Sequence, residues 1–182
     1  MGILDIFKKK TEIKLDTQKN IESEKINSII QHQPVNKKVY TYKGKNYLTT
    51  DGVAEEIKLF EKEVCKVPEE LKKFWENEGF GFIAENKDGF SFNRLLSPSE
   101  VVDFINRTDI YEWIPDSDFY TSIQDKGFVI MEYSEYIYFW IGIQPDNLGN
   151  IFYFNSKICD NFNELVKKLE NDEDVLEGIQ EK

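Results

Sequence analysis

Apolar residues recur every three or four positions in four stretches of the chain, which is the spacing of the buried side of a helix. The predicted helices begin at Asp51-Gly52, at Pro68, at Pro98 and within residues 160–164. Gly79-Phe80-Gly81 ends the second, and Ser97 with Glu100 forms a capping box at the start of the third. A thinner stripe of isoleucines predicts a loose helix over about 18–32, ended near Pro34.

Runs rich in β-branched and aromatic residues, separated by short turn sequences, predict strands. They cover residues 38–50 as a hairpin around 43–46, then 80–84, 90–92, 127–133, 136–143 and 150–154. The short links between the last three favour antiparallel pairing. Residues 109–126 lack both patterns and are predicted to form a long loop, a kind of segment that often carries function.

Strands and helices are grouped rather than strictly alternating, which predicts an α+β domain with helices packed on one face of an antiparallel sheet. We place this domain at residues 51–170. Residues 1–50 are then a basic N-terminal extension holding the loose helix and the hairpin. Residues 171–182 are an acidic C-terminal tail with a short helix over Val175–Ile179.

The strand over 136–143 is apolar on both of its sides. Tyr136, Tyr138 and Trp140 point to one face of the sheet, and Ile137, Phe139 and Ile141 point to the other. Two interpretations stay open. Either one face packs on the helices and the other under residues 109–126, or one face is a binding surface for a partner.

Charge divides the chain. The whole carries a formal charge of −11, but residues 1–50 hold ten lysines against five acids, a net of +5, and residues 51–182 carry the remaining −16. Such an acidic body repels phosphates, so direct nucleic-acid binding is not expected. A basic protein partner is favoured by the opposite field.

Little in the chain supports catalysis. It has a single histidine, His32 in a polar stretch, and two cysteines, Cys65 and Cys159, and it lacks a nucleophile elbow and a phosphate-binding loop. We therefore expect no enzyme activity, no cofactor and no metal site. A hydrolase using paired carboxylates is the alternative from another class. No apolar run is long enough to span a membrane, and no export signal is recognised, so a cytoplasmic location is expected.

Three segments resemble the SUKH superfamily, which includes the yeast Smi/Knr cell-wall regulators and many bacterial immunity proteins. They are Val67-Pro68-Glu-Glu-Leu71 through Trp75 to Gly79-Phe-Gly81, Arg94-Leu95-Leu96-Ser97-Pro98-Ser-Glu100-Val101, and Gly149-Asn-Ile151-Phe-Tyr153 followed by Ile158-Cys-Asp-Asn-Phe162-Asn-Glu-Leu165. The resemblance covers about residues 54–170. It implies an α+β fold and a non-enzymatic protein that binds and neutralises a toxin of a polymorphic system, many such toxins being nucleases.

The family resemblance does not locate the toxin-binding surface, so its candidates come from the residues. Aromatic anchors inside an acidic rim suit a basic partner. The candidate toxin contacts are Trp113, Asp116, Asp118, Tyr120, Glu132 and Glu135. The alternative function is an intracellular regulatory or scaffold domain that has no toxin partner.

Overall fold

A computed structural model describes residues 47–84, 91–171, 173–177 and 179. The predicted helix over 18–32, the first strand of the predicted hairpin and the turn between the strands at 80–84 and 90–92 lie outside these residues.

The described strands form one seven-stranded antiparallel sheet, in which each strand pairs with the next strand along the chain. They are β1 (Tyr47–Thr49), β2 (Phe80–Phe82), β3 (Ser91–Leu95), β4 (Gly127–Ser134), β5 (Ile137–Gly142), β6 (Ile151–Tyr153) and β7 (Ser156–Cys159). The predicted antiparallel α+β fold is confirmed. β1 pairs with β2, so the sheet begins before the predicted domain start at residue 51.

The four predicted helices of this region are present: α2 (Val53–Glu63), α3 (Glu69–Asn77), α4 (Pro98–Asn106) and α6 (Phe162–Glu170). The predicted capping box is confirmed at α4, where the Ser97 hydroxyl accepts the Glu100 N–H at 3.1 Å and the Glu100 carboxylate accepts the Ser97 N–H at 2.9 Å. Pro68 is the N-cap of α3 rather than its first residue, because its ψ of 136° is extended rather than helical.

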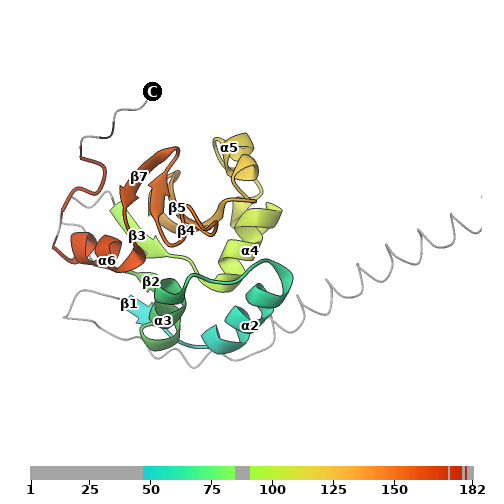
Figure 1. The fold of residues 1–182 in the computed structure, drawn as a ribbon. Coiled ribbons are helices and arrows are strands. Elements are labelled where there is room, and N and C mark those ends of the chain that lie inside the picture. The colour runs from blue at the N-terminus through green and yellow to red at the C-terminus, as the bar shows by residue number, and fades with distance from the viewer. Residues whose placement is uncertain (1–46, 85–90, 172, 178, 180–182) are drawn as a thin grey trace, which may run out of the picture. The chain divides into compact units, whose positions relative to one another are not determined.

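The main core lies between α2, α3, α6 and one face of the sheet (Figure 1). Phe60 of α2 contacts Phe128 of β4 at 5.0 Å between ring centroids, and Phe74 of α3 contacts Phe162 of α6 at 5.2 Å. Strand alternation points Tyr138 to the opposite face. Its ring contacts residues of α4 and of the segment that follows it, so both faces of the central strands are buried there.

Residues 109–126 are not a loop, contrary to the prediction. They form a 3₁₀ turn, η1 (Asp109–Tyr111), and a short helix, α5 (Ser117–Ser122). Both are too short for helical periodicity to show in the sequence, and burial of Tyr111, Ile114 and Tyr120 against the sheet holds them in place. In Figure 1, α5 lies beside α4 on the side of the sheet away from α6. The interpretation that this segment covers the second face is therefore correct for its centre.

Two further predictions at the C-terminal end were wrong or incomplete. β7 was not predicted, because four residues with one polar and one charged side chain carry little strand signal. Within the predicted tail, Val175–Glu177 form a turn rather than a helix, and Val175 is buried in the core. The acidic tail therefore contributes an apolar residue to the packing of the domain.

Gly79 allows the chain to turn sharply at the end of α3. Its φ is +98°, and a Cβ at this position would lie 2.0 Å from the backbone oxygen of Thr49. The chain leaves α3 directly against the end of β1, which only glycine permits. This glycine is therefore needed for the fold.

Candidate binding site

Arg94 of β3 joins four elements through a half-buried polar cluster. Its guanidinium donates to the Glu132 carboxylate of β4 at 2.8 and 3.1 Å, to the Tyr111 hydroxyl of η1 at 2.8 Å, and to the Glu100 carboxylate of α4. Glu100 also closes the capping box with Ser97. The carboxylates therefore neutralise a cation that the fold has largely removed from water.

The electrostatics of the cluster keep Arg94 charged. Desolvation lowers the pKa of Arg94, but the neighbouring carboxylates Glu100 and Glu132 outweigh it and raise the pKa above its ordinary value. Burial raises the pKa of Tyr111, so its hydroxyl stays protonated and accepts from Arg94 as a neutral group. The cluster thus links the sheet to α4 and η1 through hydrogen bonds from a charged guanidinium.

Two exposed aromatic rings, from residues that closely follow members of this cluster in the sequence, contact each other. Trp113, two residues after Tyr111, and Tyr136, in the turn between β4 and β5, lie with their ring centroids 5.8 Å apart and their planes nearly perpendicular, at 88°. Trp113 is 69% exposed and Tyr136 is 47% exposed. We call them the aromatic pair. Such edge-to-face contact orders both rings while leaving most of the indole open to a partner.

The segment that carries Trp113 is negatively charged, because it contains acidic residues and no basic ones. Residues 108–125, here called the acidic segment, contain five acids and neither lysine nor arginine. All five are exposed: Asp109, Glu112, Asp116, Asp118 and Asp125. Glu135, next to Tyr136, is exposed as well. Aromatic surface and negative charge thus occur together along this part of the chain.

The predicted contact residues fall into two groups. Trp113, Asp116, Asp118 and Glu135 are exposed. Tyr120 is only 3% exposed, packed against Phe104 and Tyr138, and its place is in the core rather than on a contact surface. Glu132 is half-buried and paired with Arg94 at 2.8 Å, so its charge is already neutralised within the domain.

Sequence reasoning missed three residues that belong to this region. Arg94, which entered only as part of a family motif, and Tyr111 were not among the predicted contact residues, although an arginine followed by Leu95-Leu96 is a signal that a carboxylate partner exists nearby. Ile110, in η1 and 65% exposed, was hidden by the loop prediction. Its exposure adds apolar surface to the acidic segment.

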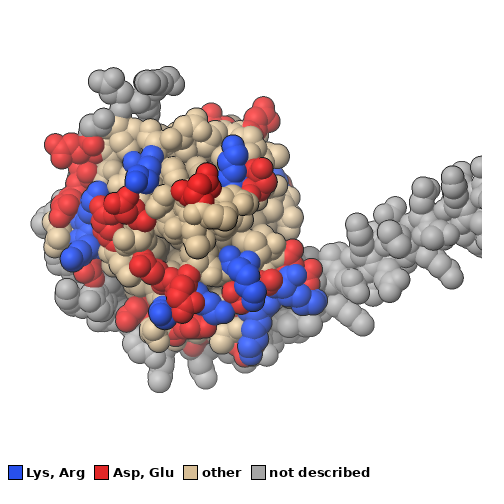
Figure 2. Space-filling view, in the orientation of Figure 1, with Lys and Arg blue, Asp and Glu red and all other residues tan. Residues whose placement is uncertain are grey.

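Charge elsewhere on the surface is mixed. On the face seen in Figure 2, basic side chains gather over α2, while acidic side chains are spread over much of the remainder. Lysines on and near α2 and α3 are paired: Lys72 of α3 lies 3.0 Å from Glu61 of α2, and Lys66 lies 3.5 Å from the same carboxylate. The acidic segment, which contains no lysine or arginine, differs from this mixed surface.

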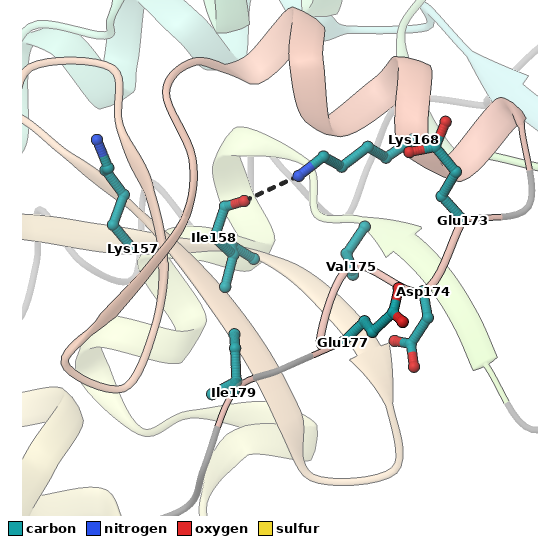
Figure 3. A pocket seen from close by; sticks show the side chains of 8 residues that line it. All are labelled: Lys157, Ile158, Lys168, Glu173, Asp174, Val175, Glu177 and Ile179. Atoms are coloured by element: carbon teal, nitrogen blue, oxygen red, sulfur yellow. Dashed lines mark hydrogen bonds between the residues drawn. The ribbon is translucent and has the colours of Figure 1, made fainter.

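Two hollows open elsewhere on the domain. One, of about 360 Å³, lies between β7, α6 and the C-terminal residues (Figure 3). Its Lys168 donates to the Ile158 carbonyl at 3.2 Å and pairs with Glu164 at 3.3 Å. The other, of about 540 Å³, lies between the C-terminal end of α2 with the two residues after it, α4 and the start of β4, and its lining mixes apolar residues such as Val102 and Phe128 with polar ones such as Gln124. The lysine that faces the first hollow is thus already engaged within the protein.

The part of the chain that the structure describes offers neither a metal cluster nor a membrane-spanning helix. No three histidine, cysteine or acidic side chains in this part of the chain gather in a way that could hold a metal ion. Within the same residues, no helix has the length and apolarity needed to cross a membrane.

Comparison with known proteins places the chain. It is 32% identical to immunity protein YxxD of Bacillus subtilis (strain 168) over 124 residues, which are 67% of this chain and 83% of the relative. The chain belongs to the family of this immunity protein. No family model matches the sequence, and no solved structure gives a significant match.

Proposed function

We propose that the protein is a bacterial immunity protein that binds a cognate toxin stoichiometrically and neutralises it without catalysis. The observation that carries the proposal is the kinship to an immunity protein over most of that relative's length. The resemblance of the helix and turn motifs to the SUKH superfamily agrees with it. In this proposal the protein acts in the cytoplasm of the cell that makes it.

The contact surface proposed is the aromatic pair with the exposed acids of the acidic segment and Glu135. A large exposed indole is the kind of side chain that anchors a protein interface. Six exposed carboxylates, five on the acidic segment and one at Glu135, give the surrounding surface a negative field that accelerates encounter with a basic partner. Trp113 supplies the apolar anchor and the acids supply the steering.

The partner proposed is a basic toxin domain, most simply a nuclease. A nuclease binds phosphates through lysine and arginine, so its active groove is positively charged. An acidic protein that covers this groove blocks the substrate and satisfies the same cations. The net charge of −16 on residues 51–182 supports this choice of partner.

The test begins with the partner. The tagged full chain is used as bait in its own host while the host's secreted toxins are expressed, and a recovered toxin domain is then titrated with the purified chain. We expect a one-to-one complex and rescue of growth when toxin and chain are produced together. Recovery of housekeeping proteins alone, with no rescue, would favour the regulatory or scaffold function instead.

The surface is tested separately by charge reversal. The variant Asp116→Lys, Asp118→Lys, Glu135→Lys should weaken toxin binding by about tenfold or more at low salt and flatten its salt dependence. The matched control reverses three exposed acids of α2 and α3, Glu55, Glu69 and Glu76, which changes the net charge by the same amount. Equal losses in both variants would show that net charge alone matters and would remove this surface from the proposal.

A further inference from the structure

Trp113 is exposed, but the residues close to it in the sequence are buried and fix the position of its backbone. Tyr111, two residues before it, and Ile114, directly after it, are 2% and 5% exposed. The ring of Tyr111 contacts Phe104 of α4 at 5.2 Å between centroids. The exposed indole therefore stands between two anchored positions.

The polar anchor of this segment is Arg94. The guanidinium of Arg94 donates to the Tyr111 hydroxyl at 2.8 Å. The same guanidinium holds Glu132 of β4, two residues before the end of the strand that leads into the Glu135-Tyr136 turn. One side chain therefore connects the strand before Tyr136 with the 3₁₀ turn before Trp113.

Arginine suits this position because its planar fork contacts several partners in fixed directions. Two of its nitrogens serve Glu132, and its terminal nitrogens reach Glu100 and Tyr111. Both Glu132 and Arg94 side chains are 18% exposed, so the bonds act where water competes weakly. Such a cluster fixes geometry more than it adds stability, because desolvation of the charges offsets much of their attraction.

From this geometry we infer that Arg94 is a positioning residue for the binding surface: by holding Tyr111 and Glu132 together, it sets the edge-to-face contact of Trp113 with Tyr136. The inference deepens the proposed function and rests on it only for its consequence in toxin binding. The positioning itself is a property of the free protein. An interface anchor that is ordered before binding loses less conformational entropy when the partner arrives.

The experiment is ¹⁹F NMR of the full chain labelled with 5-fluorotryptophan. The chain has three tryptophans, so three resonances arise, and the variant Trp113→Phe assigns that of Trp113. Trp75 and Trp140 are buried, and their resonances report whether each variant is folded. Tyr136→Leu should shift the Trp113 resonance in the natural sequence, because it removes the neighbouring ring.

In the Arg94→Met background we expect the Trp113 resonance to move toward that of free 5-fluorotryptophan and the effect of Tyr136→Leu to be largely lost. The control is Lys72→Met, which breaks the 3.0 Å ion pair with Glu61 between α3 and α2 and should leave the Trp113 resonance in place. An unchanged Trp113 resonance in folded Arg94→Met, still shifted by Tyr136→Leu, would overturn the inference.

A second variant decides the case in which Arg94→Met fails to fold, as seen from the Trp75 and Trp140 resonances. Tyr111→Phe removes only the hydroxyl that Arg94 contacts and keeps the packed ring. It should shift the Trp113 resonance in the same direction by a smaller amount, and no shift would refute the positioning role. Because none of these spectra needs a toxin, a failure of the proposed function would be seen separately.

Discussion

Replacing a buried and an exposed tryptophan by phenylalanine compares how much each side chain contributes to the stability of the fold. Trp75 of α3 is fully buried, and its indole N–H donates to the backbone carbonyl of Leu96 at 3.0 Å. Trp75→Phe removes that donor, which costs about 1–3 kcal/mol for a buried acceptor left unmet. The smaller ring leaves a void worth about 1 kcal/mol more. We expect a loss of about 2–4 kcal/mol in the free energy of unfolding.

Trp113→Phe is the control within the same series. The exposed indole makes an edge contact with Tyr136 but fills no core space, so the change should stay within about 0.5 kcal/mol. Urea denaturation followed by circular dichroism measures both. With a slope of about 2 kcal/mol per molar, Trp75→Phe should lower the midpoint by about 1–2 M. Equal midpoints for the two variants, or a loss below about 0.5 kcal/mol at Trp75, would refute the reasoning.

Two further predictions concern stability. Gly79→Ala should lower the unfolding midpoint sharply, because its Cβ would meet the Thr49 oxygen at 2.0 Å and its φ is +98°; an unchanged midpoint in the same assay would contradict this. The carboxylate of Glu56 accepts from the N–H and hydroxyl of Ser99 at 3.1 and 2.9 Å, yet burial raises its pKa. The folded state then holds the Glu56 proton to a higher pH than the unfolded state, so its contribution to stability falls as pH rises from about 4.5 through the raised pKa. Glu56→Gln should remove this fall, so that the variant gains on the natural protein across that range; a difference that shrinks or stays flat in denaturation series at successive pH values would contradict it.

The strong local patterns were read correctly because each of them repeats a simple physical requirement. The capping box at Ser97 satisfies free N–H groups within four residues, and the apolar stripes of α2, α3, α4 and α6 match the helical period over nine residues or more. The strands β4 and β5 are long and rich in aromatic and β-branched residues. Local sequence carries all of this information.

The errors cluster in short elements and in residues whose partners are distant. η1, α5 and β7 are three to six residues long. Tyr111 of η1 and Tyr120 of α5 contact Arg94 and Tyr138, 17 and 18 positions away, whereas β7 pairs with the neighbouring β6. Tyr120 was predicted to face a partner as an aromatic anchor, and Glu132 as part of an acidic rim suited to a basic partner. The structure instead buries one against Phe104 and pairs the other with Arg94, neither of which is near it in the sequence.

The sequence by itself determined the α+β class, the acidic body, the main helices and strands, and the region in which exposed aromatic and acidic residues occur. It did so because periodicity, capping and charge act between residues close in the chain. Only the tertiary structure decided which of those residues remain exposed, and it alone joined Trp113 to Tyr136 and Arg94 to Tyr111. Burial and ion pairing are set by what packs against each side chain, and two of the partners of Arg94, Tyr111 and Glu132, lie 17 and 38 positions away in the sequence.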